Sequence, residues 1–289
     1  MKKCNLCGKN ADLAYRLTSE NIFKCKNCGL VFTDTDSIKQ ENSREMYEKD
    51  YFTTTHPNFF RECSKDYPKY MGKSSKLQRF HKTLMTLKRF KPGGRILDIG
   101  CATGVFLDMA KKEGYKPQGL DISKYASEYA KSNFNVDVFT GYLENAPFPK
   151  KSFDIITMWD FIEHVNDPKA TLKKAASLVK EDGIILILTT NEYSLMCWLG
   201  NLMYKCSFGI IKKPAELIHP VHHITHFSEK TLKRMLHEAG LKPVYMKKSE
   251  MPLQNVEGNI LIKATVAMLY IFAWIIRKPH EIQVIARKK

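Results

Sequence analysis

Apolar and polar positions along the chain predict strands and helices that follow one another in turn. Residues 95–99 and 153–156 are short apolar runs of the kind that form buried parallel strands. An amphipathic helix is expected over 74–90, and the Pro-Gly-Gly sequence that follows marks its end. Further along, a helix at 229–239 precedes a strand at 242–246. Strands that alternate with helices predict an α/β domain with a doubly wound sheet.

The turn after the first of these strands is the most informative feature of the sequence. Gly100 and Gly104 allow the backbone to turn sharply and to approach a ligand closely, and the turn aims helix N-terminal amides at that ligand. Asp98 places a carboxylate beside the turn, which suits a ligand that carries a cationic group. Asp121 follows the next strand at the spacing expected of a ligand to ribose hydroxyls. A dinucleotide fingerprint would need a third glycine where the chain has Val105.

The segment Asp98-Ile-Gly-Cys-Ala-Thr-Gly104 resembles motif I of the class I S-adenosylmethionine (SAM) methyltransferases. Three later segments resemble that family in the same order: the strand at 153–156, the EH-x-x-DP-like segment 160–168, and the turn and fifth strand at 178–188. The resemblance implies a seven-stranded Rossmann-like methyltransferase sheet with SAM as cofactor. On the matching positions it implies cofactor contacts from Asp98, Gly100, Ala102, Gly104, Asp121, Ile122, Leu143, Glu144, Trp159 and Tyr51.

Some cofactor positions depart from the family pattern or leave an alternative open. Ala102 replaces the commoner middle glycine, a small change that should still admit the cofactor. After Gly141 the family often has an acid for the adenine amino group, whereas here Glu144 is the nearest carboxylate. Tyr51 belongs to a Y-x-x-x-YF segment that lies over the cofactor in zinc-ribbon relatives. An aromatic contact that merely holds the linker on the domain is the alternative.

Two Cys-x-x-Cys pairs near the N-terminus have the spacing of a closed metal site. Each pair can wrap one side of a tetrahedral ion, and a glycine follows the second cysteine of each pair. A redox dithiol is the alternative, but two matched pairs favour structural zinc. We therefore expect a zinc ribbon and linker over residues 1–45 and a methyltransferase domain over 46–289. The expected zinc ligands are Cys4, Cys7, Cys25 and Cys28.

Histidines gather after the fifth strand, in residues 219–228, which resemble the family's HH-x-x-HFS segment. Histidine titrates near neutral pH and can take a proton from an acceptor hydroxyl. His222, His223 and His226 are therefore candidate catalytic bases, with the alternative that they brace the loop or face solvent. A metal site built from the four histidines of this segment is disfavoured, because Pro220 interrupts the helix that would gather them.

A second candidate cluster follows the fourth strand. Asp160, Glu163 and His164 would share one face of a helix. Ubiquinone-type O-methyltransferases have E-x-x-EH at this place, and there the side chains resemble a divalent-metal site for a catechol. The favoured alternative is that Asp160 caps the helix while Glu163 and His164 form a buried hydrogen bond.

Residues 260–276 are apolar almost all round and have basic neighbours. The segment is slightly short of a membrane span, and residues 281–287 resemble the final strand of the sheet, which must return to the core. We therefore expect a helix that lies on a membrane or covers an apolar substrate pocket; a core helix or a dimer face is the alternative. The expected lid consists of residues 193–227 and 255–277.

The net charge indicates the kind of partner, and the N-terminal sequence indicates the compartment. The net charge is +16, and fifteen Lys and Arg stand against six acids from Lys205 onward, which favours a localised basic face. Such a face suits RNA, anionic lipid or a phosphorylated substrate. The N-terminal sequence lacks the apolar segment of a secretory signal, so a cytoplasmic location, or one at the inner face of the membrane, is expected.

The expected activity is SAM-dependent methyl transfer to an oxygen, in preference to carbon or nitrogen, of an apolar, lipid-linked, sugar or quinone-type small molecule. An RNA methyltransferase would explain the charge but not the apolar insert. Met158-Trp159-Asp160 also stands where amino-methylating enzymes carry N/D-P-P-Y/F. A non-catalytic SAM-binding protein is a third possibility.

Overall fold

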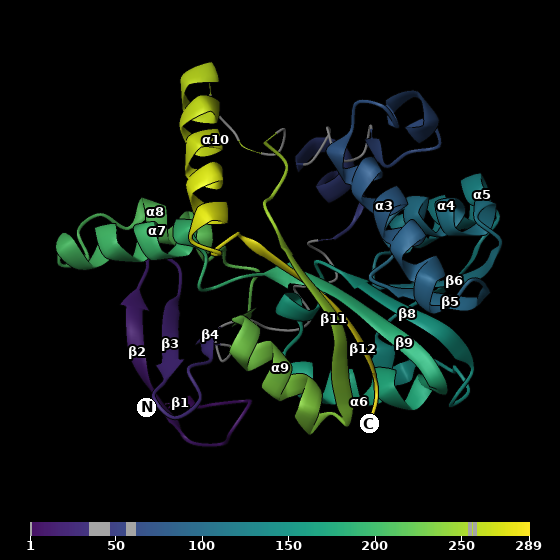
Figure 1. Ribbon diagram of the computed structural model, residues 1–289, viewed down its shortest axis with the longest axis horizontal. Helices are drawn as coiled ribbons and strands as arrows, with labels where there is room; N and C mark the ends of the chain where they lie inside the picture. Colours follow the sequence, from purple (N-terminus) through teal and green to yellow (C-terminus); the bar gives the residue numbers. More distant parts are fainter. Residues whose placement is uncertain (1, 35–46, 56–61, 254–255, 257–258) are drawn as a thin grey trace. The chain divides into compact units, whose positions relative to one another are not determined.

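A computed structural model describes the chain except for residues 1, 35–46, 56–61, 254–255 and 257–258 (Figure 1). Most of the predicted linker and part of the second predicted lid segment therefore lie outside the described residues. Contacts divide the chain into two compact units. The first unit comprises Met1–Ile38, Asp160–Leu172 and Ile187–Ala286, and the second comprises Lys39–Trp159, Lys173–Leu186 and Arg287–Lys289.

The larger of two β-sheets has seven strands. They are β5 (Gly94–Ile99), β6 (Tyr115–Asp121), β7 (Asp137–Thr140), β8 (Phe153–Trp159), β9 (Val179–Thr190), β11 (Leu241–Ser249) and β12 (Glu281–Lys288). Their order is β11-β12-β9-β8-β5-β6-β7, and β5 pairs in parallel with both β6 and β8. The chain thus starts at a central strand, runs outward and returns on the other side, which places a topological switch point between β5 and β8. This confirms the predicted doubly wound seven-stranded α/β fold.

Eight helices and four short helical turns are described. The helices are α3 (Ser75–Phe90), α4 (Val105–Lys112), α5 (Lys124–Phe134), α6 (Pro168–Leu178), α7 (Leu195–Cys206), α8 (Lys213–Ile218), α9 (Glu229–Glu238) and α10 (Ile260–Ile275). The turns are η2 (Tyr51–Thr55), η3 (Tyr67–Tyr70), η4 (Leu143–Asn145) and η5 (Ile162–His164). Within the second unit α4 and α5 lie against the strands β6 and β7 (Figure 1).

Local sequence explains where these elements begin and end. The predicted helix over 74–90 is confirmed as α3, which begins at Ser74, whose side chain accepts a hydrogen bond from the Leu77 amide. Strand β9 already starts at Val179, where the sequence predicted a turn. A Cβ at Gly183 would lie 2.6 Å from Val179 Cγ2, so the glycine permits the tight bend of this strand.

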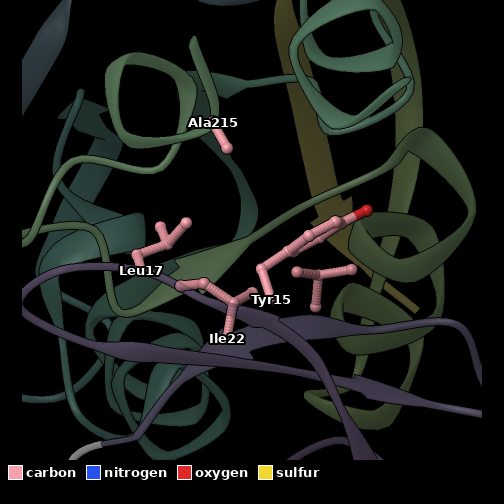
Figure 2. Close-up of a cluster of buried hydrophobic side chains, with 5 residues drawn as sticks. Tyr15, Leu17, Ile22 and Ala215 are labelled. Atoms are coloured by element: carbon pink, nitrogen blue, oxygen red, sulfur yellow. The ribbon is translucent and has the colours of Figure 1, made fainter. Parts of the chain in front are cut away.

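The smaller sheet is antiparallel and contains the N-terminal segment. Its strands are β1 (Lys2–Lys3), β2 (Asn10–Arg16), β3 (Asn21–Cys25), β4 (Val31–Thr33) and β10 (Thr225–His226), in that order. The last strand comes from the histidine-rich segment, and it places Thr225 opposite Phe32 and His226 opposite Val31. Figure 2 shows Tyr15 and Ile22 of this sheet, with Leu17 directly after β2, beside Ala215 of α8 in one buried cluster. The N-terminal sheet therefore shares a core with a helix of the predicted lid.

Candidate functional site

Asp98 is the next-to-last residue of strand β5, and its carboxyl group is buried in the second unit. Its Oδ1 accepts a hydrogen bond of 2.6 Å from the Thr157 hydroxyl on the neighbouring strand β8. Burial raises the pKa of Asp98 to about 8, and the nearby Asp121 carboxylate acts in the same direction. A cationic ligand group at this place, as expected for the cofactor, would favour the ionised form of Asp98.

Asp121 ends the adjacent strand β6 and holds the glycine turn in place. Its Oδ2 accepts a 2.8 Å hydrogen bond from the Ala102 amide, and its Oδ1 accepts one of 2.9 Å from the Ser123 amide. Because the carboxyl ends of parallel strands meet at one edge of the sheet, Asp98 and Asp121 lie at the same edge. This edge is where ligands bind in doubly wound folds.

The turn between β5 and α4 uses left-handed backbone at three positions. Gly100, Ala102 and Gly104 have φ angles of +78°, +47° and +82°. The positive angle at Ala102 explains why glycine is the commoner residue there. A Cβ at Gly104 would lie only 2.7 Å from Ala130 Cβ on helix α5. Gly104 thus serves the packing of α4 on α5 as well as the turn.

Trp159 ends strand β8 at the same edge. Its ring packs edge-on against Phe80 and Phe106, at centroid distances of 4.8 and 5.1 Å. Its buried Nε1 has no hydrogen-bond partner among the residues that the structure describes. An unsatisfied indole donor is costly in a folded protein, so a bound ligand with an acceptor atom would fit this site.

The remaining predicted cofactor residues lie around this edge in the second unit. Leu143 is buried and Glu144 is exposed in the short turn η4, while Ile122 is half-buried directly after β6. Tyr51 begins η2, and the Glu48 carboxylate just before it accepts a 3.4 Å hydrogen bond from the Lys124 amide at the start of α5. The donors and acceptors at this edge suit SAM, and the ten residue assignments stay predictions.

The four N-terminal cysteines of the first unit converge on one point. The Sγ atoms of Cys4 and Cys28 are 3.4 Å apart, and those of Cys7 and Cys25 are 3.5 Å apart. No disulfide joins these four residues. Zn–S bonds of about 2.3 Å in a tetrahedron separate neighbouring sulfurs by about 3.8 Å, close to these distances. The four side chains therefore fit a closed tetrahedral metal site.

The three candidate catalytic histidines fall into two clusters of the first unit. His222 and His223 lie with His164, and the rings of His164 and His222 stack at 5.2 Å. His226 instead belongs to a buried cluster with His219 and Glu192. Burial, together with the neighbouring histidines, lowers the pKa of His223 well below its usual range. His223 is therefore neutral near pH 7, the form that can accept a proton.

The backbone of the segment after β8 is not the regular helix on which both expectations for Asp160, Glu163 and His164 were based. Helix η5 has only three residues, Phe161 occupies its cap position, and no side chain caps it. The prediction that Asp160 is the N-cap was wrong, because Asp160 has a left-handed φ of +46° instead of an extended conformation. Glu163 is fully buried and accepts a 2.9 Å hydrogen bond from the Thr189 hydroxyl. Burial raises the pKa of Glu163 to about 8.

Comparison with known proteins identifies the family. A family model of the methyltransferase domain matches residues 70–245. An uncharacterized protein of Methanocaldococcus jannaschii is 30% identical over 155 residues, which are 53% of this chain and 59% of the relative. A ubiquinone biosynthesis O-methyltransferase of Idiomarina loihiensis is 26% identical over 195 residues, 65% of this chain and 76% of the relative.

A solved SAM-dependent methyltransferase of Archaeoglobus fulgidus has the same fold. It is 21% identical, with a TM-score of 0.53 over 81% of this chain and all of that chain. The family match covers more than half of this chain and includes the glycine turn, Asp98, Asp121 and Trp159. The chain belongs to the methyltransferase domain family and is a SAM-dependent methyltransferase.

Proposed function

We propose that this methyltransferase transfers the methyl group of SAM to a hydroxyl oxygen of an apolar, quinone-type molecule at the inner face of a membrane. The observation that carries the proposal is the exposed apolar helix α10. Support for the acceptor class comes from the similarity to ubiquinone biosynthesis O-methyltransferases. We further propose that the chain consists of a zinc ribbon and linker over 1–45 and a catalytic domain over 46–289.

Helix α10 exposes apolar side chains on most of its circumference. Only Tyr270 and Ala273 are buried among its sixteen residues. Its large exposed apolar residues are Ile260, Leu261, Ile262, Met268, Ile271, Phe272, Trp274 and Ile275. Such a contiguous apolar surface is typical of an interaction site, and a tryptophan near a basic helix end suits the membrane interface. Among the described residues, no helix has the length and hydropathy needed to cross a bilayer.

Basic side chains lie at the C-terminal end of α10. Arg277 and Lys278 line a surface hollow of about 540 Å³ together with Lys230, Lys233 and Lys248. Each basic residue near an anionic leaflet contributes about 1 kcal/mol of attraction. Apolar insertion of α10 and attraction of anionic headgroups would therefore act at neighbouring places of the first unit.

The chemistry of O-methylation assigns tasks to the chain's own residues. When bound, SAM would supply a methyl group on a positively charged sulfur, and the new oxygen–carbon bond would replace the sulfur–carbon bond. Asp98 would hold the ammonium group of the cofactor, and Asp121 its ribose hydroxyls. A base must remove the hydroxyl proton of the acceptor. We propose neutral His223 or its neighbour His222 for that role, because both belong to the cluster with His164.

An RNA acceptor is the second candidate, favoured by the net charge of +16. Isotopically labelled SAM, incubated with the protein and with separate lipid, aqueous metabolite and RNA fractions, distinguishes the two. We expect label in the lipid fraction. Label in RNA alone would support the second candidate, and label in none of them would indicate a non-catalytic SAM-binding protein.

We expect the protein to float with anionic vesicles, and the double variant Ile271→Glu with Trp274→Glu to lose that binding by more than about tenfold. Both side chains are more than half exposed, so the fold should tolerate the change. Flotation across a salt series measures this. Binding of the wild type should weaken with salt without vanishing, because apolar insertion is not screened.

Leu13→Glu is the matched control for that experiment. Leu13 is 43% exposed on strand β2, away from α10 in the sequence, and its substitution should leave flotation unchanged. An RNA-binding protein would ignore the vesicles and lose nearly all RNA affinity as salt rises. Absence of wild-type flotation at low salt would contradict the membrane proposal.

We propose that the four N-terminal cysteines bind one structural zinc ion. Cys28→Ser should release that ion and loosen the small sheet, including β10, because β10 pairs with β4. Metal analysis and hydrogen exchange measure both effects, and β5 to β8 should keep their protection. Cys206→Ser, which alters an exposed cysteine outside the group, is the control. Freshly reduced wild-type protein without zinc would contradict the assignment.

A further inference from the structure

We infer that Glu192, His219 and His226 form a second metal site, which binds Zn²⁺ or a similar divalent cation. The three side chains come from the segment after β9, from the end of α8 and from β10. They are 7%, 0% and 2% exposed. Their ligand atoms lie within 4.8 Å of one another, separately from the cysteine group.

The distances within this cluster fit a tetrahedral ion. The Nδ1 atoms of His219 and His226 are 3.3 Å apart, and His219 Nδ1 is 3.7 Å from Glu192 Oε2. Bonds of about 2.0–2.1 Å to a tetrahedral zinc ion separate neighbouring ligand atoms by about 3.4 Å. Two imidazoles and one carboxylate are also a ligand set that zinc uses in proteins.

The hydrogen bonds around His219 fix which of its nitrogens carries the proton. Asn201 Nδ2 donates a hydrogen bond of 3.4 Å to Glu192 Oε1. This orients the Asn201 carbonyl oxygen toward His219 Nε2, at 3.2 Å. His219 Nε2 must therefore be the protonated nitrogen, and Nδ1 carries a lone pair.

His226 is fixed in the same way by a different neighbour. The Thr33 hydroxyl donates its hydrogen to the His223 carbonyl oxygen at 2.8 Å. The same hydroxyl oxygen lies 3.4 Å from His226 Nε2 and can only accept from it. His226 Nε2 is therefore protonated as well, and its Nδ1 carries a lone pair.

Three lone pairs thus converge on one buried point. Glu192 Oε2, one of the three atoms, has no hydrogen-bond partner among the described residues. Lone pairs that face one another repel unless a cation lies between them, and a buried carboxylate needs a compensating charge. The oxygen atoms of Asn201 and Thr33 that accept from the two Nε2–H groups are the kind of outer-shell partners that orient metal-bound histidines.

An ion at this point would connect parts of the first unit that are distant in sequence. His226 lies in β10 of the small sheet, His219 directly follows α8, and Glu192 follows β9. Tyr15 of strand β2 stacks on the His219 ring at 5.5 Å. Because all three ligands are buried, the ion would stabilise this packing, and its binding energy would contribute to folding.

Cobalt titration of metal-depleted protein tests the inference. We expect the wild type to bind two equivalents of Co²⁺, of which only one gives a sulfur-to-cobalt charge-transfer band. Glu192→Gln should keep the thiolate-bound equivalent and lose the other. His237→Gln, at an exposed histidine on α9 outside the cluster, should bind both.

Circular dichroism checks the fold of each variant, and His226→Gln serves as a second test of the cluster. The number of Co²⁺ equivalents that the wild type binds is a test that does not depend on the folding of any variant. A wild type that binds only the equivalent with the sulfur-to-cobalt band would overturn the inference, and so would a folded Glu192→Gln protein that still binds an equivalent without that band.

Discussion

Gly104→Ala is expected to lower SAM affinity more than tenfold and to destabilise the protein by roughly 2–4 kcal/mol. The added Cβ would lie 2.7 Å from Ala130 Cβ, and a left-handed φ of +82° is unfavourable for alanine. Either α4 moves away from α5 or the turn changes shape. Titration calorimetry with SAM and urea unfolding measure the two effects.

Gly114→Ala is the matched control, since Gly114 has a similar φ of +91° but open space where the added Cβ would lie. It should show only the smaller cost of the left-handed backbone, with SAM affinity retained. Equal losses in the two variants would mean that the contact between α4 and α5 does not position the turn.

Asp98→Asn is expected to weaken SAM binding at least tenfold and yet to stabilise the ligand-free protein near pH 8. Burial raises the pKa of Asp98 to about 8, against about 4 in an unfolded chain. Between these values the folded protein retains a proton that the unfolded chain has lost, so Asp98 makes stability fall as the pH rises. Asparagine removes this effect and can still accept the Thr157 hydrogen bond.

The gain from Asp98→Asn should grow by up to roughly 3–4 kcal/mol between pH 5 and pH 8, as measured by urea unfolding. Asp182→Asn is the control with the opposite sign, because the Lys91 ammonium lowers the pKa of Asp182. That substitution should not raise the free energy of unfolding at high pH. Unchanged SAM affinity in Asp98→Asn would contradict the assigned contact with the cofactor's ammonium group.

Features that depend on local sequence could be predicted. The glycine turn follows a continuous apolar strand, and the helix over 74–90 ends before a Pro-Gly-Gly sequence, so both appear in the order of residues. Helix α10 was also predictable, because a nearly continuous apolar run over 260–276 precedes a basic pair.

Features that depend on tertiary contacts could not be predicted. Strand β10 has two residues, too few for any periodicity, and its partner β4 lies far earlier in the sequence. Glu192 follows a buried strand and is a residue type usually found at the surface, so only its burial beside His219 and His226 reveals the cluster. The left-handed backbone at Asp160 likewise depends on its surroundings.

The most direct test of the proposed function compares two phenolic acceptors that differ only in a long prenyl tail. Both are incubated with SAM and anionic vesicles, and methylated product is measured by mass spectrometry for the wild type and for Ile271→Glu with Trp274→Glu. We predict O-methylation of both acceptors by the wild type, and a selective loss of long-tail turnover in the variant. Turnover of neither acceptor, or equal turnover of the long-tail acceptor by both proteins, would contradict the account.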